Sequence, residues 1–229
     1  MPTLVPLLEG IVGSTAYGLA REGSDVDYLG VFSYKAQDYW GLNEPPDNFK
    51  NEEGVKPDKT THEIAKYIKL ALKCNPSVLE LLWLEDYELI TYWGDRLVET
   101  RDCFLSEQLV RNSYGEYARQ QVERLQRRNE EGKIGFSSDT QKRTAKHARH
   151  CFRLLRQGRD LLETGVIQIQ LDDPETYWAF DSYSVDDIVK KFAEEDTLFK
   201  EAKSILPAGP NDWAVRSLLY DIRKDSLDW

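Results

Sequence analysis

The residue composition and apolar pattern of the sequence change near residue 105, and this change constrains the fold more than any other feature. Upstream, short apolar runs such as residues 7–12 alternate with Gly, Pro and Asn turns, as in buried strands mixed with helices. Downstream, residues 108–131 and 140–164 lack proline, are rich in Arg, Gln, Leu and Glu, and end near glycines, which is typical of helices. We therefore expect two domains, a mixed α/β unit over residues 1–105 and a helical unit over residues 106–229.

The first hundred residues predict a small mixed β-sheet flanked by helices, an α/β fold of the α+β kind. Residues 25–32 alternate and then become apolar, as a strand does. Residues 43–58, rich in Pro, Asn and acids, indicate a surface loop, and residues 59–62 fit a short third strand. Asn75 followed by Pro76 is a helix start. In the second domain, two further helices fit residues 185–206 and 212–225.

Composition excludes several classes of protein. The chain has 229 residues, 41% of them hydrophobic, so it can bury a core, and no apolar run approaches the roughly 20 residues of a membrane span. The N-terminus lacks a basic segment followed by a long apolar one, so it does not fit a signal peptide. The three cysteines show no CxxC spacing and their odd number argues against a disulfide framework. We expect a cytoplasmic protein with reduced thiols and no membrane association.

The charge is unevenly distributed along the chain. The net charge of −10 argues against a strongly basic nucleic-acid coat protein. Residues 111–159, however, carry 13 basic and 5 acidic side chains, a net charge of +8, while the flanking segments are acidic. This basic segment predicts one site for a polyanion, and a solvated Arg-rich helix face or salt bridging between domains is the alternative.

Two carboxylates form the most specific chemical signal. Asp25 and Asp27 are two residues apart on an expected strand, so both side chains should leave the same face. Like charges held together disfavour joint ionisation, and a hard divalent cation bound through oxygen relieves that cost. Upstream, Gly13-Ser14 ends a strand and opens a short helix, where backbone N–H groups and a hydroxyl could hold a phosphate.

Two aspartates supply too few ligands for two metal ions and a nucleophile, so a third carboxylate is needed. Asp58 is the best candidate, because it follows Pro57 at the end of the acidic loop and begins the next strand segment. Glu63 is the second candidate. Alone, each of these motifs also fits a turn or a solvated strand end. Their combination favours a site that binds metal and phosphate.

These residues bring the sequence close to a known family. The segment GSTAYGLAREGSDVDYLGVF resembles the signature of the DNA polymerase β-like nucleotidyltransferase superfamily, which pairs a Gly-Ser turn with an Asp-x-Asp strand. More narrowly, the chain resembles the RlaP (YcgL-type) nucleotidyltransferases, which include bacteriophage members. The narrower resemblance rests on three segments. The first has an acid, Asp58, followed by a helix, Asn75-Pro76 and Leu-Glu-Leu-Leu at 79–82. The second is an aromatic-Gly-aromatic-Ala segment at 114–118, and the third is a Lys/His/Arg helix at 146–155. It spans roughly residues 10–165, and Cys74 stands where the family has glycine.

The resemblance implies roles for single residues. Gly13 and Ser14 would hold the β- and γ-phosphates of a nucleoside triphosphate. Asp25 and Asp27 would bind two Mg²⁺ ions, with Mn²⁺ as a substitute, and Asp58 would complete the second site and help deprotonate the acceptor hydroxyl.

Four cationic or imidazole side chains are assigned to the nucleotide. Lys66 follows the third acid in the family pattern. Lys146, His150 and Arg153 are spaced four and three residues apart, so they line one face of a helix suited to a triphosphate.

The function expected from the sequence is transfer of a nucleoside monophosphate from an NTP to an acceptor hydroxyl, with release of pyrophosphate. The acceptor is expected to be an RNA or other nucleic-acid end. Transfer to a protein or a small molecule is the first alternative, and a non-catalytic nucleotide- or partner-binding module is the second. The complete set of Ser14, Asp25, Asp27 and Asp58 argues against the second.

Overall fold

The structure, a computed structural model, describes residues 2–229 except 41, 43, 52–55 and 131–137. The chain divides into two compact units, which we describe separately. Unit 1 comprises residues 1–105 and 209–229, and unit 2 comprises residues 106–208.

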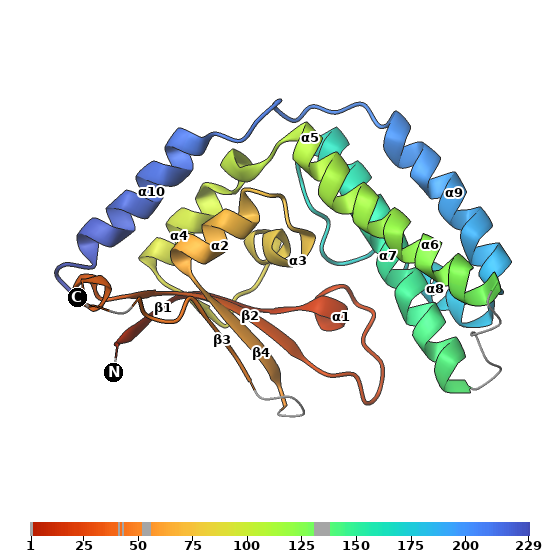
Figure 1. The fold of residues 1–229 in the computed structure, drawn as a ribbon, viewed down its shortest axis with the longest axis horizontal. Helices are drawn as coiled ribbons and strands as arrows, with labels where there is room; N and C mark the ends of the chain where they lie inside the picture. The colour runs from red at the N-terminus through yellow and green to blue at the C-terminus, as the bar shows by residue number, and fades with distance from the viewer. Residues whose placement is uncertain (1, 41, 43, 52–55, 131–137) are drawn as a thin grey trace. The chain divides into compact units, whose positions relative to one another are not determined.

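Unit 1 is built on a mixed sheet that has, in the described part of the chain, the strand order β3-β4-β2-β1-β5 (Figure 1). β2 is antiparallel to β1 and parallel to β4. β3 and β5 pair antiparallel with β4 and β1. The strand bounds are β1 (Leu4–Val12), β2 (Asp27–Tyr34), β3 (Asn48–Lys50), β4 (Asp58–Glu63) and β5 (Leu89–Ile90). The mixed α/β class expected from the sequence is thereby confirmed.

Helices of unit 1 cover one face of this sheet (Figure 1). Their bounds are α1 (Gly13–Ala16), α2 (Ile64–Ala71), α3 (Pro76–Leu79), α4 (Tyr92–Glu99) and α10 (Asp212–Asp225). α2 starts directly where β4 ends, because the Glu63 side chain accepts a hydrogen bond from the backbone N–H of Ala65 and caps the helix. α3 begins as the sequence predicts, with Asn75 as the N-cap and Pro76 in its first turn.

Residues 209–229 differ from the division expected from the sequence, which grouped them with the helical domain. α10 buries Val215, Leu218 and Ile222, spaced three and four residues apart, within unit 1. Just before the helix, the backbone N–H of Asn211 donates to the carbonyl of Cys103 at 2.8 Å. A helical pattern shows which side of a helix is apolar but not which core will receive it, so the sequence did not reveal this pairing.

Unit 2 is helical. The continuous helix expected over residues 108–131 is divided by a π-helical turn, η4 (Arg111–Glu116), which buries Tyr114 and Gly115. The other elements are α5 (Glu107–Val110), α6 (Tyr117–Glu130), α7 (Ser138–Thr164), α8 (Pro174–Trp178), η5 (Ala179–Ser182) and α9 (Val185–Glu201). α9 ends before the expected residue 206.

Two glycines allow the helices of unit 2 to pack closely around Phe199 of α9. A Cβ atom at Gly115 would lie 2.6 Å from the Phe199 ring, and one at Gly158 would lie 2.7 Å from it. Phe199 is almost fully buried. These glycines therefore make room for an aromatic side chain, which explains why neither position carries a better helix former. In the described parts of both units, no helix is long and apolar enough to cross a membrane.

Candidate active site

Two of the three predicted carboxylates begin neighbouring strands. Asp27 is the first residue of β2 and Asp58 the first residue of β4, and the two are register partners in the parallel pair. Register partners on adjacent strands are about 4.8 Å apart and point to the same face. The fold thus brings together two acids that are 31 positions apart in the sequence.

The Gly-Ser turn lies at the same edge of the sheet. β1 ends at Val12, the register partner of Asp27, and Gly13 follows with a φ of +69°. A Cβ atom at Gly13 would lie 2.5 Å from the Asp27 Oδ2 atom. Ser14 comes next, half-buried in α1, and its carbonyl accepts a hydrogen bond from the N–H of Leu19 at 2.8 Å. Glycine at position 13 therefore lets the turn pass directly against the Asp27 carboxylate.

Asp25 is at this edge but not on the strand. The sequence placed it on β2 with Asp27, whereas the strand begins at Asp27. A turn over Arg21–Ser24 precedes it, in which the backbone N–H of Ser24 donates to the Arg21 carbonyl and the Ser24 hydroxyl accepts from the Arg21 N–H. Asp25 leaves this turn with its carboxylate half-exposed and paired with Lys56. Its side chain is thus not held by the sheet pleat.

Lysines already accompany the carboxylates of this edge. Besides the Lys56–Asp25 pair, Lys50 Nζ lies 3.8 Å from the Asp58 Oδ2 atom. Within the described residues, no group of three or more His, Cys, Asp or Glu side chains is gathered closely enough to hold a metal ion. Asp25, Asp27 and Asp58 thus lie at one edge of the sheet, and Asp25 and Asp58 each have a lysine partner.

Glu63 and Lys66 lie at the other end of β4. This strand has six residues and so spans about 17 Å. Glu63 is buried, caps α2 and accepts hydrogen bonds from Tyr39 and Arg223. Lys66, in the first turn of α2, donates to the side chains of Asp47 and Asn48 at 2.8 and 2.6 Å. The structure therefore does not bring Lys66 or Glu63 to the edge that carries Asp27 and Asp58.

The predicted Lys/His/Arg face belongs to α7 in unit 2. Arg153 is almost fully buried, and its guanidinium donates to the Gln157 side chain at 2.5 Å and to His150 Nδ1 at 3.2 Å. Burial, and then the positive charge of Arg153, lower the pKa of His150 to about 3, so this ring is neutral at pH 7. Lys146 is exposed. These three side chains do share a helix face, but only Lys146 presents an exposed cation.

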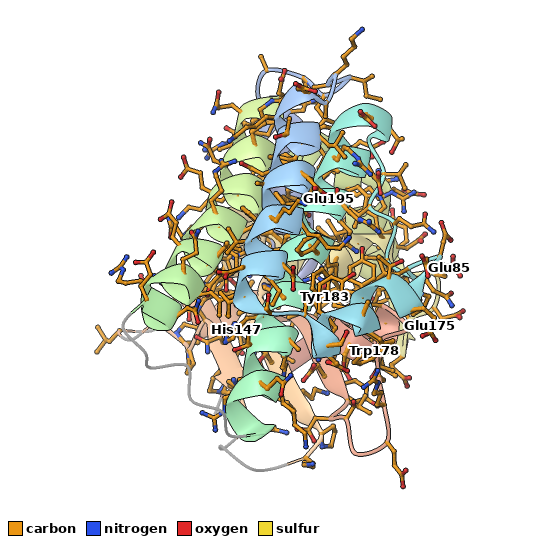
Figure 2. The ribbon with its side chains drawn as sticks, turned by 90° about the vertical axis from the view of Figure 1, so that its right-hand side faces the viewer. Glu85, His147, Glu175, Trp178, Tyr183 and Glu195 are labelled. Atoms are coloured by element: carbon orange, nitrogen blue, oxygen red, sulfur yellow. The ribbon has the colours of Figure 1, made fainter. Side chains whose placement is uncertain are left out.

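Much of the basic segment is neutralised within unit 2. Arg119 pairs with Asp196 of α9 at 2.7 Å. Arg156 pairs with Glu195 at 3.0 Å, and Arg159 approaches the same carboxylate at 3.5 Å. Figure 2 labels Glu195 on α9, beside the helices that carry these arginines. Acids from residues 160–208 thus offset several charges that gave residues 111–159 their net charge of +8.

Arg149 of α7 illustrates the same pairing at η5. Its guanidinium forms an ion pair with Asp181 and lies 4.4 Å from the centroid of the Trp178 ring, which Figure 2 also labels. The sequence does not show such partners, because each acid follows its arginine by 32 to 77 positions.

With this geometry described, comparison with known proteins is informative. The sequence profile of RlaP, described as the RNA repair pathway DNA polymerase beta family, matches residues 5–172. The chain belongs to this family. As a member of the RlaP family it is a nucleotidyltransferase, as the Gly-Ser and Asp-x-Asp motifs predicted. The matched range includes Gly13, Ser14 and all three candidate aspartates.

Other comparisons add little to the RlaP assignment. A solved nucleotidyltransferase-like protein from Exiguobacterium sibiricum is 11% identical, with 96% of this chain and 74% of that one covered and a TM-score of 0.31. No curated protein matches the sequence significantly.

Sequence reasoning missed one buried acid that supports the Gly-Ser turn of this RlaP-family chain. Glu80 of η2 (Glu80–Trp83) is buried, and it accepts a hydrogen bond from the hydroxyl of Tyr17, the residue that ends α1. Tyr17 is also buried, so its ring belongs to the core and is not available to stack on a base. A glutamate inside the apolar run LELLWL was the signal, since a buried acid needs a partner.

Proposed function

We propose that this RlaP-family chain transfers a nucleoside monophosphate from an NTP to a hydroxyl at an RNA end. One observation carries the proposal: Asp27 and Asp58 start register-paired parallel strands directly beside the Gly13-Ser14 turn. Carboxylates and a turn that carries a hydroxyl then meet at one sheet edge, and phosphoryl transfer uses both kinds of group.

The chemistry of the donor atoms suits a hard divalent cation, although the described side chains are not gathered into a metal-binding group. Asp25, Asp27 and Asp58 offer only carboxylate oxygens, which Mg²⁺ prefers and Mn²⁺ also accepts. Lys56 and Lys50 pair with Asp25 and Asp58, so two of these acids interact with a cation in this structure. When bound, Mg²⁺ would polarise the transferred phosphoryl group and stabilise the charge on the leaving oxygen. Cation binding would require Asp25 to exchange Lys56 for the metal.

Each residue of the turn and the strands has a part in the reaction. The Ser14 hydroxyl donates to a phosphate oxygen of the NTP, and Gly13 lets this turn lie directly against the Asp27 carboxylate. A carboxylate oxygen of Asp58 takes the proton of the acceptor hydroxyl, while the hydroxyl oxygen forms a bond to the α-phosphorus. The bond from the α-phosphorus to the bridging oxygen breaks, and pyrophosphate leaves with that electron pair.

An RNA end is the acceptor that the family description favours. The net charge of −10 disfavours long duplexes, because most of the surface repels phosphates. Transfer to a protein or a small molecule remains the competing proposal for the acceptor. A non-catalytic binding module is disfavoured, since the turn and both strand-end acids are retained together.

The experiment is to incubate the protein with each labelled NTP, Mg²⁺ and a pool of RNA, DNA and proteins, and to identify what becomes labelled. Asp27→Asn should lower transfer at least 100-fold and leave the unfolding transition unchanged or slightly higher, because one of two adjacent charges is removed. Asp86→Asn removes an exposed carboxylate elsewhere in unit 1 and is the matched control. Wild-type transfer by Asp27→Asn would overturn the site, and labelled protein without labelled RNA would overturn the acceptor.

A further inference from the structure

Four cations of the α6–α7 pair differ from the internally paired arginines of unit 2. Arg124 and Arg127 of α6 and Lys142 and Lys146 of α7 are exposed. Among the described residues, none of the four has an acid within ion-pair distance, unlike Arg119, Arg149, Arg156 and Arg159. Exposed arginine and lysine side chains without an internal partner are available to an external anion.

One ring contact places these cations on the same side of the two helices. α6 and α7 pack against each other and run antiparallel (Figure 1). The rings of Tyr117 on α6 and His150 on α7 meet edge to face, with centroids 5.6 Å apart. Because both helices rise by about 1.5 Å per residue, this contact sets Arg124 level with residue 143 of α7.

Helical spacing then forms a continuous track. On α6, Tyr117, Arg124 and Arg127 are seven and three residues apart, so they lie on one side of the helix. On α7, Lys142, Lys146 and His150 repeat every four residues on the side that meets Tyr117. From Tyr117 to Arg127 the track is about 15 Å long.

The track combines an aromatic ring with cations. Tyr117 is 45% exposed although its edge packs against His150, so its ring has an open surface. Residues 140–159 of α7 contain no acid that would repel a phosphate. Single-stranded nucleic acid is bound by this combination, in which bases stack on aromatic rings and cations follow the backbone. A track of this length suits about four phosphates, at 3.4 Å per residue of a stacked strand.

We infer that the side of the α6–α7 pair bearing Tyr117, Arg124, Arg127, Lys142 and Lys146 binds a short single-stranded stretch of the RNA acceptor. This inference rests on the proposed function and adds to it the surface that holds the strand. Lys146 then serves the RNA backbone and not the triphosphate. The internally paired arginines of α7 contribute stability and no affinity.

The test measures binding of a fluorescent 12-nucleotide oligouridylate to the full chain by anisotropy, in EDTA and without NTP, at several salt concentrations. Arg124→Gln/Lys142→Gln removes two cations at one level of the track. The control Lys190→Gln/Lys203→Gln removes two exposed lysines of unit 2 that lie outside the track, so the change in net charge is the same. Thermal unfolding checks that both double variants are folded.

The track variant should bind about 25-fold more weakly at 0.1 M salt, and its log–log salt slope should be less steep by about 1.4, from roughly −0.7 per phosphate contact. The control should bind within about twofold of the wild type. Tyr117→Leu should weaken binding at least fivefold with an unchanged salt slope, and Tyr117→Phe should restore it, since stacking needs the ring and not the hydroxyl.

Three outcomes would overturn this surface: no saturable RNA binding at low salt, equal losses in the track and control variants, or a loss of NTP binding by the track variant in place of RNA binding. Because the assay contains neither NTP nor metal, it is independent of transfer. Failure of Asp27→Asn to block transfer would overturn the proposed active site and leave this surface standing. Blocked transfer together with any of the three outcomes above would overturn this surface and leave the active site standing.

Discussion

Gly13 shows how a single residue couples backbone geometry to the chemistry of the site. Its φ of +69° lies in the left-handed region, and a side chain there would meet the Asp27 carboxylate at 2.5 Å. Gly18, also at positive φ, has open space around it in the described structure. Comparing a substitution at Gly13 with one at Gly18 therefore separates the effect of backbone strain from the effect of contact with the carboxylate.

We predict that Gly13→Ala lowers nucleotidyl transfer by at least tenfold and the free energy of unfolding by about 2 kcal/mol, because the methyl group displaces Asp27 in addition to straining the backbone. Gly18→Ala should cost about 1 kcal/mol from strain alone and keep its activity. Transfer assays and urea unfolding of both variants check this. Equal activity losses at the two positions would show that the Asp27 contact is irrelevant.

Ser14 tests which substrate the turn holds. We predict that Ser14→Ala raises the KM for NTP several-fold and leaves the KM for the acceptor unchanged, because its hydroxyl donates to the triphosphate. Steady-state kinetics with each substrate varied in turn provide the measurement. A change confined to the acceptor KM would reverse the assignment.

At the scale of an element, α7 carries a half-buried histidine that is neutral at pH 7. His150 Nδ1 accepts a hydrogen bond from the Arg153 guanidinium, so a proton on that nitrogen would meet a donor. Its pKa is lowered to about 3, below the usual value of about 6.5, first by burial and then by Arg153. The unfolded chain therefore binds a proton more readily than the folded chain between these two pH values.

It follows that acid destabilises unit 2 through His150. We predict that its contribution is fully present above about pH 6.5 and is lost as pH falls toward 3, with a slope of at most about 1.4 kcal/mol per pH unit. His150→Gln, which can still accept from Arg153, should unfold with a shallower pH dependence than the wild type. His147→Gln, at an exposed position of the same helix, is the control. Parallel pH dependences for wild type and His150→Gln would contradict this account.

At the scale of the whole molecule, α10 contacts strand residues that lie more than 150 positions earlier in the sequence. Arg223 donates to the buried Glu63 carboxylate at 2.6 Å and to the Ser33 hydroxyl at 2.9 Å, and it lies 3.9 Å from the Tyr39 ring centroid. The helix therefore supplies the cation that a buried acid of β4 requires.

We predict that Arg223→Met lowers the free energy of unfolding of unit 1 by about 3 kcal/mol, because Glu63 would be left buried without its cation. Adding Glu63→Gln should recover part of that loss. Arg216→Met, which removes an exposed pair with Asp212 on the same helix, should cost no more than about 0.5 kcal/mol. Urea unfolding of the four variants measures this, and additive losses for Arg223→Met and Glu63→Gln would exclude the coupling.

Local patterns determined much of this protein from the sequence alone. The Gly13-Ser14 turn, a strand that contains Asp27, the Asn75-Pro76 helix start and the bounds of α10 depend on residues close in the chain. The nucleotidyltransferase class followed from the same short-range motifs. Such features are readable because turn, cap and period rules act within a few residues.

The tertiary structure alone decided which distant groups meet. It set Asp58 in register with Asp27, kept Lys66 at the far end of β4, and placed α10 in unit 1. It also paired the arginines of α7 with acids of α9, which leaves only part of the basic segment for an outside polyanion. Strand register, helix docking and ion pairing between elements depend on packing over long sequence separations, and no local pattern carries that information.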